Sequence, residues 1–474
     1  MKKYITISIL FFSLVSFSQQ VQWASKLIKF SSDLGGKQNG IKRILGKPDA
    51  FPQGGPSPNA WCSKNALDGK ETVVVGFDTP QTVKQVAVFE NLNAGCVLSI
   101  SADNGSGKFQ VVWSKKTDWK TYYAGTFQKD RKYYFGRKRR KVEKAPEANV
   151  NPGIEYAILE NAMDNVVAIK VEFNFAMLPG QKQVDAIGIA DTETPIQALI
   201  NTKPEFESLP MPQSINLEGI NPANPALSED GQQLFITSMQ SPKDEIFSFT
   251  KDASGNWTHK TLQSNFNTGN SYNYIDYCSA DFILKGGKST VKGTTDTGYE
   301  IFKNNNGNYE STGNIQVTAY NNYDDTNDAT ISKDGKVFIM GIETDFTQGG
   351  SDLYFAFRRD DGTYGFLQNM GKIINSAADE GMAQLLSDQK TLLFSSNGFS
   401  SYGDYDIYVS YRLDDTWKNW SPPINLGSKV NSNDFDGMPF YSEKEQTLYY
   451  ITAFDGNTVL KSVPLQANIL LKEL

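Results

Sequence analysis

The residues of this sequence best suited to catalysis or ligand binding are its carboxylates. Several of them stand just before apolar segments in the second half of the sequence. They are Asp276, Asp325, Asp328, Asp379, Glu380, Asp434 and Asp436. Two carboxylates about 5 Å apart can serve as the nucleophile and the acid/base of a retaining glycosidase. Groups of carboxylates can also bind a cation or the polar groups of a ligand. We favour a third role, hydrogen bonding within the fold, over ligand contact, and ligand contact over catalysis.

Other residue types that build common active sites are scarce. His259 is the only histidine, and no cysteine or hydroxyl stands at motif spacing from it. A Ser-His-Asp triad or a histidine-rich metal site therefore lacks its parts. The sequence also has no phosphate-binding loop, dinucleotide fingerprint or Cys-x-x-Cys pair. We therefore expect a protein that is not an enzyme and that carries no cofactor or metal.

The acidic residues belong to a repeat. Degenerate copies of Leu-Ser-x-Asp-Gly-x-x-Leu-x-Phe are anchored, at intervals of 51, 53, 54 and 56 residues, by Asp230, Asp281, Asp334, Asp388 and Lys444. A second series runs in phase with the first and consists of Trp257, Tyr309, Tyr364 and Trp417. A period of this length, with a turn signal about every ten residues, is typical of propeller blades of four short strands. We predict a five-bladed β-propeller over residues 213–474, or a six-bladed one if the preceding linker hides a blade.

The anchor of each repeat is expected to shape a tight turn, with its carboxylate accepting backbone N–H groups. Charge is not required there, because Asp-Gly becomes Asp-Gln at 388–389 and Lys-Glu at 444–445. The last repeat lacks its outermost strand, and residues 214–218 have that strand's sequence. Their pairing would close the ring and remove an exposed edge.

In such a ring the acidic residues before the innermost strands would surround one mouth of the central channel. Ligands of propellers usually bind at a channel mouth. The propeller residues that we name as ligand-binding candidates are therefore Asp328, Asp379 and Asp436.

The first 18 residues are predicted to be a secretory signal. Lys2 and Lys3 precede an apolar run that ends near the small residues Ser16 and Ser18. We expect an exported chain, in the periplasm or associated with the outer membrane, with the cell surface as an alternative. No later segment reaches the roughly 18 apolar residues that a transmembrane helix needs. The formal net charge of −7 argues against nucleic acid as a partner.

Residues 19–190 alternate in the manner of short strands and predict a β-sandwich, followed by a proline-rich linker over 191–212. The loop with Trp61 and Asp68 is a candidate ligand lip, because sugar binders stack an exposed aromatic on the sugar; we favour Trp61 as a plug at one end of the sandwich. Cys62 and Cys96 are either a disulfide or free thiols, and Cys278 is expected to be a buried small hydrophobe. The basic run 137–141 is read as a solvated loop, with docking on an acidic partner or on lipopolysaccharide phosphates as the alternative.

Two resemblances follow from these segments. The Ser-x-Asp-Gly turn, followed by an apolar strand and then by an Asp/Glu-Ile-Tyr/Phe strand, resembles the TolB-type, WD-like propeller repeats of periplasmic proteins. Segments of the first domain resemble the galactose-binding-like jelly roll that precedes propellers in some Gram-negative envelope proteins; they are 23–32, 44–49, 59–61, 72–77, 85–91 and 184–189. Both occur together in OmpA-family cell-envelope proteins and in accessory components of secretion machinery. The OmpA-like module that commonly follows is not in this sequence, so we do not expect direct anchoring to the cell wall.

The resemblance implies a non-catalytic scaffold whose propeller binds a protein of an outer-membrane or secretion-associated assembly. Two alternatives stay open at this point. The chain could be a carbohydrate-binding protein that holds a glycan on its jelly roll, or a glycosidase of the five-bladed kind.

Overall fold

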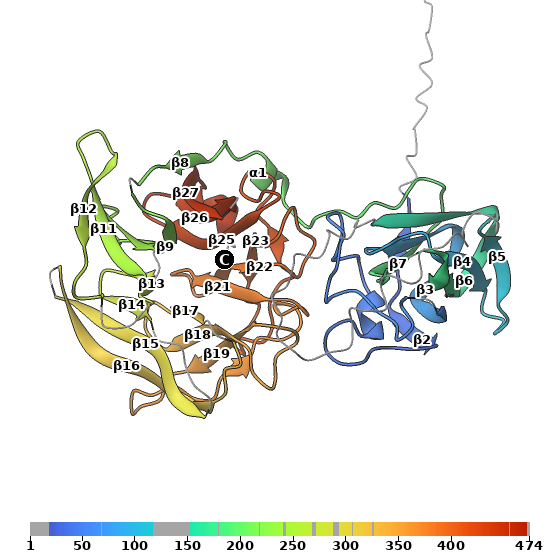
Figure 1. Cartoon of the computed structure of the whole chain (residues 1–474), viewed down its shortest axis with the longest axis horizontal. Coiled ribbons are helices and arrows are strands. Elements are labelled where there is room, and N and C mark those ends of the chain that lie inside the picture. The colour runs from blue at the N-terminus through green and yellow to red at the C-terminus, as the bar shows by residue number, and fades with distance from the viewer. Residues whose placement is uncertain are drawn as a thin grey trace, which may run out of the picture.

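The computed structural model describes residues 19–67, 69–116, 152–178, 180–217, 219–239, 243–267, 272–287, 293–305, 307–324, 327–454 and 456–471. The predicted signal segment 1–18 and the basic run 137–141 lie outside the described residues. Two all-β units lie side by side, the first coloured blue to green and the second green to red (Figure 1). Among the helices that the structure describes, none is long and apolar enough to cross a membrane.

The first unit is a sandwich built from one bent sheet, in the order β1-β7-β3-β6-β4-β5 with β2 beside β3. Its strands are β1 (Val21–Trp23), β2 (Lys26–Phe30), β3 (Lys70–Glu90), β4 (Val97–Asp103), β5 (Gln110–Ser114), β6 (Gly153–Asn174) and β7 (Ala186–Ala190). The first half of β3 pairs with β2 and its second half with β7, while β6 follows both halves. Irregular pairing between Gly76 and Gln85 separates the halves, as expected where a strand bends from one layer into the other. Valines from both halves meet in one buried core, including Val73, Val75, Val86 and Val88.

Trp61 belongs to this core. It is 1% exposed, and its ring packs against Phe173 and Phe175 at centroid distances of 5.9 and 6.3 Å. Its indole N–H donates to the Ser32 carbonyl oxygen at 3.3 Å. No face of the ring is open for a sugar to stack on, so Trp61 is a core residue and its naming as a ligand-binding candidate was wrong. Asp68, the other residue of that candidate loop, lies outside the described residues.

The three cysteines are buried free thiols. Cys62 Sγ accepts a hydrogen bond from Gln181 Nε2 at 2.8 Å, whereas Cys96 Sγ lies 3.8 Å from the Asn93 carbonyl oxygen. The Cys62–Cys96 disulfide that the sequence left open is therefore not formed, because each thiol is held in its own surroundings. Burial raises the pKa of Cys96 to about 12, which makes it a poor nucleophile. Cys278 packs in the apolar core between blades, as expected.

The second unit is a propeller of five four-stranded sheets, as predicted. The strands of each blade are given from the channel outward. Blade 1 consists of β9 (Pro222–Leu227), β10 (Gln233–Ser238), β11 (Glu245–Lys251) and β12 (Trp257–Leu262). Blade 2 consists of β13 (Tyr274–Cys278), β14 (Phe282–Gly286), β15 (Thr294–Asn305) and β16 (Asn308–Tyr320). Blade 3 consists of β17 (Asp328–Ile331), β18 (Val337–Ile342), β19 (Asp352–Phe357) and β20 (Gln368–Asn369). Blade 4 consists of β21 (Glu380–Leu385), β22 (Thr391–Ser396), β23 (Asp406–Tyr411) and β24 (Ile424–Asn425). Blade 5 consists of β25 (Phe435–Ser442), β26 (Thr447–Phe454), β27 (Asn457–Pro464) and β8 (Gln213–Ile215). The apolar clusters lie between neighbouring blades, so each sheet depends on the next one for burial.

The ring closes as the sequence predicted. Strand β8 pairs antiparallel with β27, with Ile215 opposite Leu460 and Ser214 opposite Lys461. The first strand of the propeller in sequence is thereby the outermost strand of its last blade, and it covers β27 at Leu460, Lys461 and Ser462.

Three of the five repeat anchors, Asp230, Asp334 and Asp388, form the expected turns. Asp230 Oδ1 accepts hydrogen bonds from Ser228 Oγ at 2.6 Å and from the Gln232 N–H at 3.0 Å, and Asp334 makes the same pair with Ser332 and Lys336. In these three turns the residue after the anchor has positive φ, +70° at Gly231, +67° at Gly335 and +54° at Gln389. Blade 4 thus makes this left-handed turn without a glycine.

The segment 191–212 is docked on blade 4 and forms no blade of its own, which removes the six-bladed alternative. It contains the short helix α1 (Pro204–Glu207), whose Phe206 is buried in the cluster with Leu426. Glu207 accepts hydrogen bonds from Tyr402 Oη at 2.7 Å and Ser428 Oγ at 2.6 Å. The linker therefore fastens the sandwich to one side of the propeller.

Candidate functional site

The channel of the propeller has a cavity at each end of the innermost strands. We call the end where these strands begin the entry mouth, and the end where they finish the exit mouth. The two mouths differ in how far their polar groups are already engaged, and this difference decides which of them can bind a ligand.

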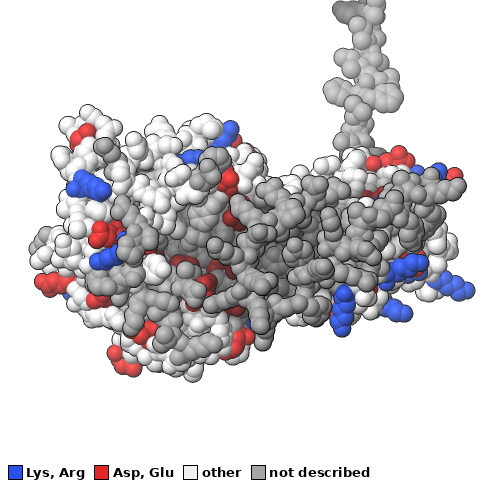
Figure 2. Space-filling view, in the orientation of Figure 1, with Lys and Arg blue, Asp and Glu red and all other residues white. Residues whose placement is uncertain are grey.

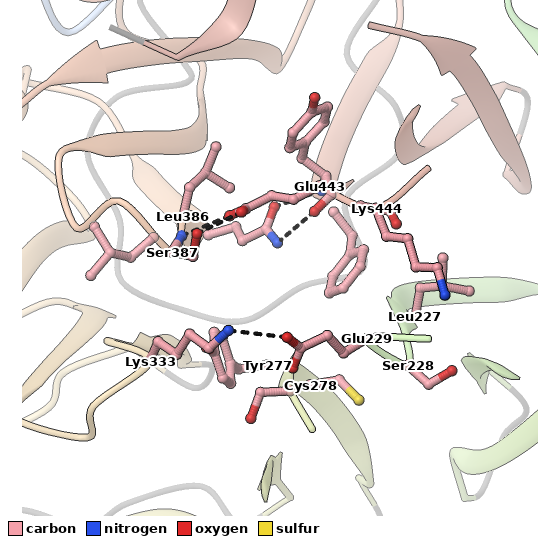
Figure 3. A pocket seen from close by; sticks show the side chains of 16 residues that line it. Leu227, Ser228, Glu229, Tyr277, Cys278, Lys333, Leu386, Ser387, Glu443 and Lys444 are labelled. Atoms are coloured by element: carbon pink, nitrogen blue, oxygen red, sulfur yellow. Dashed lines mark hydrogen bonds and ion pairs between the residues drawn. The ribbon is translucent and has the colours of Figure 1, made fainter. Parts of the chain in front are cut away.

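The exit mouth holds a cavity of about 270 Å³ whose polar groups bridge the blades. Glu229 of blade 1 pairs with Lys333 of blade 3 at 3.0 Å (Figure 3). Glu229 also accepts a hydrogen bond from the Ala280 N–H of blade 2 at 2.7 Å. Glu443 of blade 5 accepts hydrogen bonds from the N–H and Oγ of Ser387 in blade 4, at 2.8 and 2.5 Å (Figure 3). These groups hold the ring together, and little of their bonding capacity is left for a ligand.

The entry mouth is larger and acidic. Its cavity of about 490 Å³ lies within the size range of small-molecule and side-chain pockets. Its lining includes the carboxylates Asp244, Asp324, Asp328, Asp379 and Glu380, the tyrosines Tyr272, Tyr274 and Tyr405, and, among the residues that the structure describes, no lysine or arginine. On the face seen in Figure 2, acidic side chains gather in the hollow over the centre of the propeller. A described lining with five acidic residues and no lysine or arginine makes this mouth better suited to a cation than to an anion.

Below this mouth the channel narrows to a cavity of about 20 Å³, which we call the throat. Each blade contributes two or three residues of its innermost strand to the lining, and one of them in each blade has a polar or methionine side chain. In order around the ring these residues are Asn224, Asp276, Asp328, Met382 and Met438. Asn224, Asp328, Met382 and Met438 also line the entry mouth, so the two cavities are continuous.

Irregular backbone places these side chains in the channel. The pairing of the innermost strand shifts at Asn224, Asp276, Met382 and Met438. Asn224, Met382 and Met438 have φ values of +44°, +52° and +53°. A bulge turns its side chain away from the direction that regular pleating would give. Strain of this kind, repeated in several blades around one channel, is typical of functional positions.

Asp276 is fully engaged. Its Oδ1 accepts from Asn224 Nδ2 at 2.8 Å, and its Oδ2 accepts from Tyr299 Oη at 2.7 Å and from the Ala329 N–H at 3.1 Å. Burial raises its pKa to about 6 against the opposing effect of these hydrogen bonds. Asp276 therefore joins blades 1, 2 and 3 and has little capacity to act as a nucleophile or an acid.

Asp328 has bonding capacity to spare. Its Oδ1 is buried and accepts no hydrogen bond from any residue that the structure describes. Burial raises the pKa of this carboxyl to about 7, an effect that the peptide N–H groups of Met382 and Ala383 oppose and the nearby Asp276 reinforces. Gly341 and Gly381 make room for it, since a Cβ atom at either position would clash with its carboxylate. The fold thus keeps a carboxylate with one buried, unused oxygen at the junction of mouth and throat.

The other acidic candidates have different environments. Asp379 lines the entry mouth, and its Oδ1 accepts from the Ser351 N–H at 2.9 Å. Asp436 is buried and accepts from the N–H and Oγ of Ser432 at 2.6 and 2.7 Å, and it lines neither cavity. Its naming as a ligand-binding candidate was therefore wrong, because it lies outside both cavities, although its Oδ1 accepts no hydrogen bond from any residue that the structure describes.

The remaining acidic residues of the set also divide by environment. Glu380 occupies the position of Asp436 in blade 4 and accepts from the N–H and Oγ of Ser376 at 2.7 and 2.6 Å, as the structural interpretation predicts. Asp434 is exposed outside both cavities, and Asp325 lies outside the described residues. His259 is exposed on the outermost strand β12 and joins no site.

Sequence reasoning missed Asn224, Met382 and Met438. A signal for them exists, because the throat residue stands six positions before the repeat anchor in blades 1, 3, 4 and 5 and five before it in blade 2. The sequence analysis grouped the acidic residues by type alone. It therefore combined the throat position with a second repeat position, eight residues before the anchor, where Glu380 and Asp436 have a structural role. The distance of each residue from its anchor distinguishes these two positions.

No protein-family model and no curated protein matches the chain. Solved structures with a related architecture include TolB from Acinetobacter baumannii, with 14% identity over 51% of this chain and 54% of TolB and a TM-score of 0.30. They also include α-L-arabinofuranosidase from Lactobacillus brevis, with 12% identity over 53% of this chain and 92% of the enzyme and a TM-score of 0.35. An endo-arabinase from Bacteroides thetaiotaomicron has 14% identity over 58% of this chain and 99% of the enzyme, with a TM-score of 0.34. This likeness transfers no activity or partner, and the propeller assignment rests on the strand pairing itself.

Proposed function

We propose that this chain is an exported, non-catalytic scaffold of the cell envelope whose propeller binds a protein partner through the entry mouth. The partner belongs to an outer-membrane or secretion-associated assembly, and the first domain is of the galactose-binding-like kind. Export and envelope location rest on the signal-like first 18 residues and on the resemblance to TolB-type repeats in envelope proteins.

The observation that carries the proposal is the contrast between the two mouths. Glu229, Lys333 and Glu443 bridge the blades at the exit mouth. The entry mouth presents an acidic cavity with an unused buried oxygen on Asp328. Loops from several blades form its rim on a rigid ring, which suits recognition of another protein.

A catalytic role finds less support at this mouth. A retaining glycosidase needs two carboxyl groups about 5 Å apart that are both free to react. Asp276, the throat neighbour of Asp328, accepts three hydrogen bonds, and Glu380 is bonded to Ser376 and Ser396. Glycan binding through the first domain loses its main support, because Trp61 is in the core.

The test is to tag the full chain in its native host, solubilise the envelope in a mild detergent and identify co-purifying proteins by quantitative mass spectrometry. We expect an envelope protein at a stoichiometric level. Recovery of the chain alone, together with hydrolysis of an arabinan or another glycan by the purified chain, would overturn the proposal.

A further inference from the structure

Asp328 Oδ1 accepts no hydrogen bond from any described residue, and this indicates which chemical group of a partner binds in the mouth. We propose that the throat receives the ammonium group of a lysine side chain from the protein partner. This inference rests on the proposed function, since it names what the entry mouth recognises on that partner.

Charge favours a cation, and the bonding pattern selects Asp328 as its acceptor. Acidic residues line the entry mouth, and its described lining contains no lysine or arginine. Asp276 and Glu380 spend their oxygens on hydrogen bonds within the protein. Asp328 Oδ1 is buried, has no donor among the described residues, and belongs to a side chain that lines both the mouth and the throat. An ammonium donor would satisfy it with a charge-assisted hydrogen bond.

The size of the throat selects among cations. A cavity of about 20 Å³ holds about one water-sized group. An ammonium group is a compact point charge, whereas a guanidinium is a plane with a fork of donors that this cavity cannot hold. Among the described residues, no group of three or more histidine, cysteine, aspartate or glutamate side chains is arranged to hold a metal ion.

The walls above the throat suit the stem of a lysine. Met382 and Met438 flank the passage from the mouth to the throat, and Tyr272, Tyr274 and Tyr405 line the mouth. A lysine buries its four methylene groups against apolar surface of this kind. Aromatic faces also attract an approaching ammonium group.

The test uses the full chain labelled with ¹³C at the methionine methyl groups and titrated with Nα-acetyl-lysine amide. The methyl signals of Met382 and Met438, assigned from their leucine variants, report directly on the throat. We expect both signals to shift, with affinity at least about tenfold weaker for the arginine analogue and for Nε-acetylated lysine. Asp328→Asn should weaken binding about 10- to 100-fold, as loss of a charge-assisted hydrogen bond does, while the exposed acid variant Asp434→Asn should not.

Several results would overturn the inference. One is no shift at about 10 mM probe, where even a millimolar site is mostly filled. Others are equal binding of the lysine and arginine probes, unchanged binding by Asp328→Asn, or shifts caused by Ca²⁺ or K⁺ and not by lysine. The outcomes also separate this inference from the proposed function. If a partner co-purifies equally with wild type and Asp328→Asn, the scaffold function stands and lysine recognition by Asp328 is contradicted. If the lysine probe binds but no partner co-purifies, the lysine site stands and the scaffold function is contradicted.

Discussion

Asn59 of the sandwich and Gly398 of blade 4 meet in a buried hydrogen bond, with Asn59 Nδ2 at 2.6 Å from the Gly398 carbonyl oxygen. The same side chain accepts the Ala377 N–H at 2.8 Å through its Oδ1. Ala377 begins the short segment that carries Asp379 and Glu380 to the entry mouth. The first domain therefore supports a loop of the mouth from outside.

Asn59→Ala should loosen this junction. It leaves a buried N–H and a buried carbonyl oxygen unpaired, at a cost of about 1–3 kcal/mol for each group. We expect a larger radius of gyration by small-angle X-ray scattering and faster proteolysis of residues 191–212. Asn104→Ala, at an exposed loop position of the same domain, serves as the control. Identical scattering for the two variants would mean that Asn59 does not hold the units together.

Ionisation of Asp328 should lower the free energy of unfolding of the propeller as pH rises. Burial raises its folded-state pKa to about 7 from an ordinary value near 3.8. Between these values the folded chain binds more protons than the unfolded chain does, so stability falls as pH rises through this window. Asp328→Asn removes the titration. We expect its melting temperature to match that of the wild type near pH 4 and to exceed it by about 2–4 °C or more above pH 7. In a domain of this size, each kcal/mol of unfolding free energy shifts the melting temperature by about 2–4 °C.

The control for the pH experiment is Asp434→Asn, which removes an exposed carboxylate from the same propeller. Its melting temperature should follow the wild type at every pH. If Asp328→Asn were less stable than the wild type at pH 8, its carboxylate would be a structural acceptor like Asp436, and the binding role would lose its basis.

Ring closure by β8 should set the stability of the propeller. Ile215 lies opposite Leu460 in the pairing of β8 with β27 and packs against the core between blades. Ile215→Asp should lower the melting temperature by several degrees, because it places a charge against that core. Ser214→Asp, on the exposed side of the same strand, should have little effect. Equal melting curves for the two variants would contradict closure at this strand.

An asparagine repeats as a clamp on the third strand of three blades. Asn431 accepts the Ile407 N–H at 2.8 Å and donates to the Ile407 carbonyl oxygen at 3.0 Å, and Asn375 and Asn267 do the same for Leu353 and Ile246. Asn431→Ala should destabilise the chain by about 1–3 kcal/mol, since the Ile407 N–H loses its acceptor while the Ile407 carbonyl oxygen keeps the Leu426 N–H at 3.1 Å. Denaturant unfolding measures this, and a loss below about 0.5 kcal/mol, the usual size of a surface substitution, would contradict the clamp.

Much of this fold could be predicted from the sequence because a periodic motif can be recognised within a single sequence. The spacing of the five repeat anchors, from Asp230 to Lys444, predicted five blades, and the strand-like segment at 214–218 predicted the closure. The site was harder, because residue type alone does not say which carboxylate has a spare oxygen. Asp276 and Asp328 have the same side chain and neighbouring places in the throat, and they differ in the donors that tertiary packing brings to them.

In the first domain, too, the sequence did not predict which side chains are buried or which lie together. Trp61 and Cys62 stand in one loop, and neither the burial of the indole nor the separate surroundings of Cys62 and Cys96 follows from their spacing. Both depend on where the two halves of β3 place their neighbours. Long-range packing of this kind has no local signal in a single sequence.

The most direct measurement is affinity capture from the native envelope with three tagged chains: wild type, Asp328→Asn and Asp434→Asn. We predict that wild type and Asp434→Asn retain the same envelope protein in stoichiometric amount and that Asp328→Asn loses most of it. Equal recovery of that protein by all three chains, or recovery of none by a folded wild-type chain, would contradict partner binding through Asp328 at the entry mouth.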